Sequence, residues 1–302
     1  MTPLTSHPFR IGTRASPLAL AQAEMAKAAL CAAHRWAADA VLLVPMLSSG
    51  DKDQSRPLAD MGGKALWTKE LERALIDGDI DIAVHSMKDV ETVRPDTFHI
   101  AAMLPRADVC DRLIGADSIL SLPPSALVGT SSPRRAAQLK ALRPDLRTAP
   151  IRGNVATRMA KVANGDFAAT LLAAAGLDRL GLGNTGFAIA TDQMLPAASQ
   201  GAIGIDCLSA RTELTPVLAA INHAETFACV MAERLFLEVL SGNCHSPVAA
   251  LAVVKDKGVW LSGQILSEDG SESISGKGDD PVALAQHLLA QASPELKALF
   301  ET

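Results

Sequence analysis

Residues 126–142, ALVGTSSPRRAAQLKAL, carry the clearest signal of secondary structure in the chain. A short apolar run at residues 126–130 is typical of a buried strand, and Ser132-Pro133 is typical of a helix start. Pro144 then ends the predicted helix. A strand, a tight polar turn and a helix in this order predict one unit of an α/β fold.

The same alternation continues on both sides of this stretch. Further strands are predicted at residues 9–13, 41–47, 80–84, 146–151, 168–174 and 202–208, and helices at 16–35, 68–76 and 154–163. Strands and helices in turn predict parallel sheets covered by helices. The strand at 202–208 would return to the first half, so that two α/β domains are connected twice.

The C-terminal part has a different pattern. A long amphipathic stretch at 224–240 precedes alternating strands at 248–254, 259–266 and 272–276 and a terminal helix, which predicts a small α+β domain. We therefore expect domain 1 at residues 1–104 plus 202–220, domain 2 at 105–201 and domain 3 at 221–302.

Composition excludes several classes of protein. The chain has 302 residues and a net charge of −5, with 3% aromatic residues and no Tyr, which disfavours nucleic-acid binding. The N-terminus lacks the pattern of a signal peptide, and no apolar run approaches the ~18 residues of a membrane span. Five scattered cysteines give no zinc or disulfide pattern. We expect a cytoplasmic protein without a metal site.

Positive charge gathers locally despite the acidic total. Residues 131–161 hold eight Lys and Arg against one acid, a local charge of +7. Such a window is either a binding surface for small anions or a solvated helix face. Within it, Thr130, Ser131 and Ser132 form a turn at a helix start, where free N–H groups attract an anion that Arg134 and Arg135 could grip.

The alternative interpretation of this turn is an ordinary Ser-capped helix with exposed arginines. However, Arg152 follows the next predicted strand, and Arg158 lies in the next helix. Because ligands bind at the carboxyl ends of strands in open α/β sheets, the repetition favours a binding site.

Two segments of the first half likewise place charged and polar residues directly after predicted strands. Arg14 and Ser16 follow the first strand, and Lys88 and Asp89 follow the third. The adjacent Lys88 and Asp89 form either a surface ion pair or a site in which the carboxylate stabilises a developing positive charge.

Two loops also have open interpretations. The segment from Ser48 to Trp67, which includes Lys64, is either a lid over a site or disordered. Trp67 could cover a flat ligand or pack in the core. Cys244, in the turn Gly242-Asn-Cys-His-Ser-Pro247, is either buried filler or a site of covalent attachment.

The assembled motifs resemble those of the porphobilinogen deaminase (hydroxymethylbilane synthase) family nearly from end to end. They are IGTRASPLAL, GGKALWTKELERAL, DIAVHSMKDV, VGTSSPRRAAQL, RGNVATRM, AAAGLDRLGL, QGAIGI and ERLFLEVLSGNCHSP. The resemblance implies an α/β fold with two doubly wound domains like those of periplasmic binding proteins and a third, small α+β domain. It also implies a transferase that condenses four porphobilinogens on a covalent dipyrromethane primer and releases hydroxymethylbilane.

The resemblance also implies roles for residues. Asp89 would be the catalytic carboxylate, Cys244 would hold the dipyrromethane by a thioether, and Lys64 and Trp67 would belong to a mobile loop. Cofactor-binding residues would be Lys88, Asp89, Thr130, Ser131, Ser132, Arg134 and Arg135. Substrate-binding residues would be Arg14, Ser16, Arg152, Arg158 and Gln200. The partner would be porphobilinogen alone, with no nucleic acid and no membrane, and the protein would be a monomer.

Some positions depart from the family pattern. Ser199 precedes Gln200 where Gly is usual, and Asn243, Ser246, Asp60 and Trp67 also differ from the commoner residues. A non-catalytic carboxylate-binding module of the periplasmic-binding-protein type is the alternative function. It explains the arginines but gives Cys244 and Asp89 no task.

Overall fold

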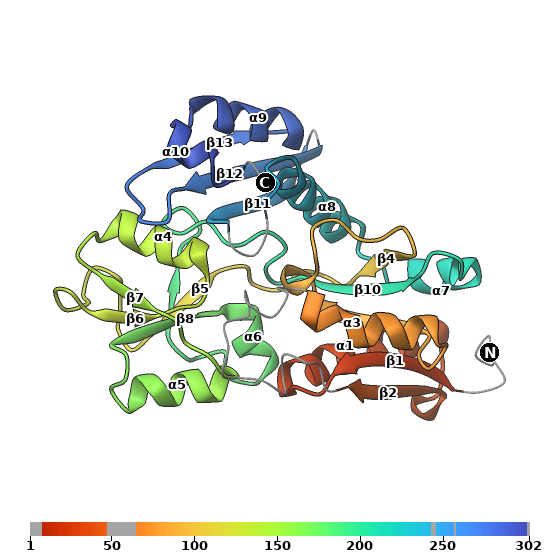
Figure 1. Ribbon diagram of the computed structural model, residues 1–302. Coiled ribbons are helices and arrows are strands. Elements are labelled where there is room, and N and C mark those ends of the chain that lie inside the picture. The colour runs from red at the N-terminus through yellow and green to blue at the C-terminus, as the bar shows by residue number, and fades with distance from the viewer. Residues whose placement is uncertain (1–7, 47–64, 243–245, 257, 301–302) are drawn as a thin grey trace. The chain divides into compact units, whose positions relative to one another are not determined.

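The computed structural model describes residues 8–46, 65–242, 246–256 and 258–300, and of residues 65–67 only the backbone. The chain forms two compact units, Met1–Ala107 with Ala202–Phe227, and Asp108–Gly201 with Ala228–Thr302 (Figure 1).

The sheet of the first unit has the strand order β2-β1-β3-β10-β4. Its strands are β1 (Phe9–Arg14), β2 (Val41–Met46), β3 (Ile82–Ser86), β4 (Phe98–Met103) and β10 (Ile203–Leu208). Strands β2, β1 and β3 are parallel, whereas β10 is antiparallel to both neighbours. The sheet is therefore mixed and not wholly parallel as predicted, because β10 starts beside the end of β3, with Ile203 opposite Ser86.

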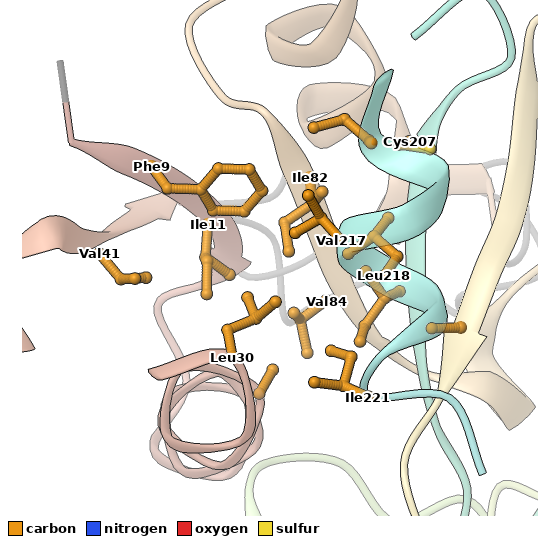
Figure 2. Packing of buried hydrophobic residues seen from close by; sticks show 14 of the residues in the cluster. Phe9, Ile11, Leu30, Val41, Ile82, Val84, Cys207, Val217, Leu218 and Ile221 are labelled. Atoms are coloured by element: carbon orange, nitrogen blue, oxygen red, sulfur yellow. The ribbon is translucent and has the colours of Figure 1, made fainter. Parts of the chain in front are cut away.

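Helices cover both faces of this sheet. They are α1 (Pro17–His34), α3 (Ala65–Ile76) and α7 (Thr215–Ala219), with 3₁₀ turns η1 (Ala38–Ala40), η3 (Met87–Asp89) and η4 (Thr212–Leu214). Ile82 and Val84 pack in one core with α1 and α7 (Figure 2). Ala83, between them, packs against Leu71 of α3 on the other face. Successive side chains of a strand point to opposite faces of the sheet, and this alternation determines which helix each side chain contacts.

The second unit contains a sheet with the order β7-β6-β8-β5-β9. Its strands are β5 (Asp111–Ile114), β6 (Leu127–Gly129), β7 (Arg147–Ala149), β8 (Ala169–Ala173) and β9 (Phe187–Ile189). Here β5 is the antiparallel strand. Helix α4 (Pro133–Leu142) packs on one face through Leu139, and α5 (Val155–Ala163) and α6 (Ala174–Arg179) cover the other around Leu172.

A third sheet, also in this unit, is an antiparallel meander of β11 (Val248–Lys255), β12 (Gly258–Leu266) and β13 (Ser273–Gly278). Helices α8 (Ala224–Val239), α9 (Pro281–Gln291) and α10 (Pro294–Lys297) accompany it. Phe236 of α8 and Leu288 of α9 are fully buried in its core. Helix α4 reaches this sheet through a 2.7 Å hydrogen bond from Gln138 Nε2 to Gln264 Oε1.

The predicted fold class, two doubly wound α/β domains with a small α+β domain, is confirmed by these sheets. The exact domain boundaries stay a prediction. The short strands β4, β5 and β9 were not predicted. Helix α3 begins at Ala65, so the backbone of Trp67 lies in a helix and not in the loop to which we assigned it.

Among the described residues, no single helix is both long and apolar enough to cross a membrane. The bent pair Thr212–Ala219 and Ala224–Val239 passes that test of length and composition only when the two helices are taken together.

Candidate active site

The first group of predicted site residues lies at the carboxyl ends of β1 and β3. These strands are parallel neighbours, with Ile11 beside Ile82, so the residues that follow them meet at one edge. A small pocket of about 40 Å³ lies there. It is lined by Arg14, Ser16, Leu18, Ala19, Gln22, Val84, His85, Ser86 and Asp89. Arg14, Ser16 and Asp89 therefore lie around one pocket.

Asp89 is held by the short turn η3. Met87, the first residue of this turn, is buried, and its N–H donates to the carbonyl of Ala202 at 3.1 Å. Gly204 lies over Met87, and a Cβ at that position would overlap the Met87 sulfur. The half-buried carboxylate of Asp89 has no hydrogen-bond or ion-pair partner in the part of the chain that the structure describes. It therefore forms no ion pair with Lys88, which is half-buried beside it.

The pocket wall is polar and partly fixed by internal bonds. Gln22 Nε2 donates to Ser86 Oγ at 2.7 Å, and Ser16 Oγ caps α1 by accepting from Ala19 N at 3.3 Å. His85 is buried and lies within β3, one residue beyond the end of the strand predicted at 80–84, and its Nε2 lies 3.6 Å from Asp206 Oδ2. Burial lowers the pKa of His85 below its usual value of 6.5 and outweighs the opposing effect of Asp206.

The second group gathers at the start of α4. Ser132 caps the helix by accepting from Arg135 N at 3.4 Å, and its own N–H donates to Thr130 Oγ1 at 3.2 Å. The Ser131 hydroxyl donates to the carbonyl of Ile151 at 2.9 Å and accepts from its N–H at 3.1 Å. The turn is therefore tied to the segment that leads to Arg152.

Arg134 and Arg135 are buried, not exposed as an ordinary capped helix would leave them. Arg134 Nη2 donates to Asp111 Oδ2 at 2.8 Å, and Arg135 Nη2 donates to Asp111 Oδ1 at 2.6 Å. Gln200 Nε2 donates to the same Oδ1 at 2.9 Å. Burial alone would raise the pKa of Asp111, but the two guanidinium charges hold it well below its usual range.

This network retains unused binding capacity. Two guanidinium charges share one carboxylate, so one net positive charge stays buried. The Nε atoms of Arg134 and Arg135 are also buried, and neither has an acceptor among the described residues. An incoming carboxylate would compensate both the charge and the missing hydrogen bonds.

Arg152 lies just before α5, and Arg158 lies within it. Arg158 Nε donates to the carbonyl of Gly153 at 2.8 Å. Arg152 Nη2 is buried and, within the described ranges, finds no acceptor. This group belongs to one compact unit and the pocket with Asp89 to the other.

The positively charged window is not, as a whole, a ligand surface. Arg143 binds Asp145 at 2.7 Å, Arg147 Nε donates to the carbonyl of Ser125, and Lys140 Nζ donates to the carbonyl of Glu268. These side chains serve the fold of their own unit. The interpretation of the window as an anion-binding surface therefore stays a hypothesis for its other members, which are Arg134, Arg135, Arg152, Arg158 and Lys161.

Lys64 and Cys244 lie outside the described residues, as does the side chain of Trp67. Conversely, sequence reasoning did not assign Asp111, Gln22 or His85 to the site. A lone Asp in the apolar run of β5, in a unit rich in arginine, is the signal that could have identified Asp111.

Comparison with protein families gives two matches. The model of "Porphobilinogen deaminase, dipyromethane cofactor binding domain" matches residues 9–216, and that of "Porphobilinogen deaminase, C-terminal domain" matches residues 227–297.

Curated relatives match over nearly the whole chain. The porphobilinogen deaminase of Sphingopyxis alaskensis is 54% identical, with 98% of each chain covered. That of Paracoccus denitrificans is 45% identical, with 98% of this chain and 95% of the relative covered. Among solved structures, a TRAP periplasmic solute binding protein from Desulfovibrio salexigens matches at 12% identity and a TM-score of 0.43, with 74% of each chain covered.

Proposed function

The chain belongs to the porphobilinogen deaminase family, and from this membership we propose that it joins four porphobilinogens head to tail. Each condensation releases one ammonia, and one water releases the product, hydroxymethylbilane. The enzyme is then a transferase of tetrapyrrole and heme biosynthesis. Its location in the cytoplasm and its monomeric state stay predictions.

Asp89 is the proposed catalytic carboxylate. Loss of ammonia from the aminomethyl group leaves a positive charge spread over the substrate pyrrole. A fixed carboxylate lowers the energy of that cation and can accept the pyrrole N–H. The observation that carries this assignment is the half-buried, unpaired carboxylate of Asp89 in a pocket shared with Arg14. Arg14 and Ser16 would bind the substrate carboxylates.

When bound, the dipyrromethane cofactor would supply a tethered, nucleophilic pyrrole. Its acidic side chains suit the second group of residues, where the buried net positive charge and the unpaired Nε atoms of Arg134 and Arg135 favour a carboxylate. Thr130, Ser131, Ser132 and Lys88 would add hydrogen bonds. Arg152, Arg158 and Gln200 would act on the growing chain's carboxylates.

Cys244 would hold the cofactor by a thioether. A tether keeps every condensation local and so raises the effective concentration of the nucleophile. Lys64, which precedes α3 in the chain, and Trp67, whose backbone lies in the first turn of α3, would contact the bound substrate.

Intact-mass measurement of the purified holoenzyme tests this proposal. The wild type should carry an adduct of two pyrrole units, which Cys244→Ser should lack, and it should release ammonia from porphobilinogen. Unmodified wild-type protein from a porphyrin-competent host, with no consumption of porphobilinogen, would refute it and favour the non-catalytic module.

A further inference from the structure

Arg94, which no motif singled out, joins three elements of the first unit. Its Nη1 lies 2.5 Å from Glu72 Oε1 and 2.9 Å from Glu91 Oε2, and its Nη2 lies 2.6 Å from Asp206 Oδ2. Glu72 belongs to α3, Asp206 belongs to β10, and Glu91 lies two residues beyond Asp89. We call these four residues the Arg94 cluster.

The guanidinium of Arg94 is fixed in place. Its side chain is only 7% exposed, and it lies over the ring of Phe98 at 5.2 Å. Burial by itself would lower the pKa of Arg94, but the neighbouring carboxylates of Asp206 and Glu72 outweigh this effect, and the net pKa is raised. The guanidinium therefore stays charged. A buried ion pair with several good hydrogen bonds is costly to break, because the remaining charges lose their partner.

The cluster also holds an excess of negative charge. Three carboxylates surround one guanidinium, and the carboxylate of Asp89 acts on the same neighbourhood through its effect on His85. Without Arg94, Glu72 and Glu91 would repel each other and Asp206. Helix α3 would keep the 3.5 Å hydrogen bond from Thr68 Oγ1 to Glu91 Oε2 but lose the ion pairs that join Glu72 to Glu91 and Asp206 through Arg94.

We propose that Arg94 is a positioning residue for the condensation reaction: it clamps α3 and β10 to the turn that carries Asp89. The proposal rests on the catalytic role proposed for Asp89. Because a small misplacement of a reacting group is costly, Arg94 acts on the rate of reaction and not on binding of porphobilinogen.

Kinetics of the holoenzyme test the catalytic part. Arg94→Met should lower kcat by about 10-fold to 100-fold, with the wild-type adduct mass and a KM within about twofold, and Arg94→Lys should recover part of kcat. Arg211→Met is the matched control. It removes partly buried ion pairs with Asp81 and Glu213 in the same unit, and should leave kcat nearly unchanged. A wild-type kcat in Arg94→Met, or an equal loss in Arg211→Met, would overturn the proposal.

Hydrogen exchange tests the clamp without reference to activity. Amides of residues 68–76 and 87–91 should exchange faster in Arg94→Met and Arg94→Lys than in wild type, and unchanged exchange in both variants would refute the clamp. If Asp89→Asn keeps near-normal turnover, the proposed function of Asp89 fails, whereas faster exchange would still establish the clamp itself. If Arg94→Met does not fold, the same measurements on Arg94→Lys decide.

Discussion

The side-chain amide of Gln200 donates a 2.9 Å hydrogen bond to Oδ1 of Asp111, although the two residues are 89 positions apart. Gln200 Nε2 also donates to the carbonyl of Val109 at 2.7 Å. The residue just before the return to the first unit therefore helps to orient the carboxylate that holds Arg134 and Arg135.

Replacement of Asp111 by Asn should be strongly destabilising. It leaves two buried guanidinium groups without a counter-charge, and we expect a loss of about 3–5 kcal/mol in the free energy of unfolding. Urea unfolding followed by circular dichroism measures this loss. Asp145→Asn, which removes the exposed partner of Arg143, is the control and should change the midpoint far less. Equal shifts in the two variants would contradict the assigned importance of the buried pair.

Ser199→Gly should stabilise the protein. Ser199 is buried at a φ of 64°, in the left-handed region, while its N–H donates to Glu233 Oε2 at 2.6 Å. Glycine relieves a backbone cost of roughly 1–2 kcal/mol, and its greater freedom in the unfolded chain leaves a net gain of about 0.5–1 kcal/mol. Thermal unfolding measures the gain. Ser199→Ala keeps the strain and should give none, so a gain in both variants would exclude this explanation.

Asp89→Asn should keep the two-pyrrole adduct and lose turnover by orders of magnitude, because the amide is nearly isosteric but cannot balance a positive charge. Mass spectrometry and ammonia release, measured on the same preparation, separate the two effects. Near-normal turnover would remove Asp89 from its catalytic role.

Protonation of His85 should weaken the fold in acid. In the unfolded chain the imidazole takes a proton near pH 6.5, whereas in the folded protein its pKa is lower. The unfolded chain therefore binds more protons as the pH falls below 6.5, and stability should decline there. NMR titration should place the midpoint below 6.5. It should rise in Arg94→Met, because the Arg94 charge disfavours the imidazolium. A wild-type midpoint at or above 6.5 would contradict the assignment.

Much of the fold could be predicted because local signals agree with it. Ser16-Pro17 and Ser132-Pro133 start α1 and α4 as expected, and both serines accept the capping hydrogen bond. Strands β5 and β9 have only four and three residues. They are held in the extended conformation by pairing, β5 with β8 and β9 with β5. Such short segments have too little periodicity to be recognised.

The candidate site was predicted only in part for a similar reason. Arg14, Ser16 and Asp89 follow strands, so topology alone brings them together. Asp111, the partner of Arg134 and Arg135, could not be found in this way. It lies beside them only because β5 pairs antiparallel with β8 in the folded sheet. The Arg94 cluster likewise joins residues up to 134 positions apart, from Glu72 to Asp206, which no local pattern records.

The interior position of β10 has a consequence for synthesis on the ribosome. Strands β5 to β9 are contiguous in the chain, so the second sheet can close as soon as residue 189 has emerged. The first sheet must wait for residues 203–208, and until then β3 has an open edge and β4 has no neighbour. The first sheet, which contains the earliest strands of the chain, therefore closes after the second sheet, and Asp89 follows β3, the strand that lacks one neighbour until then.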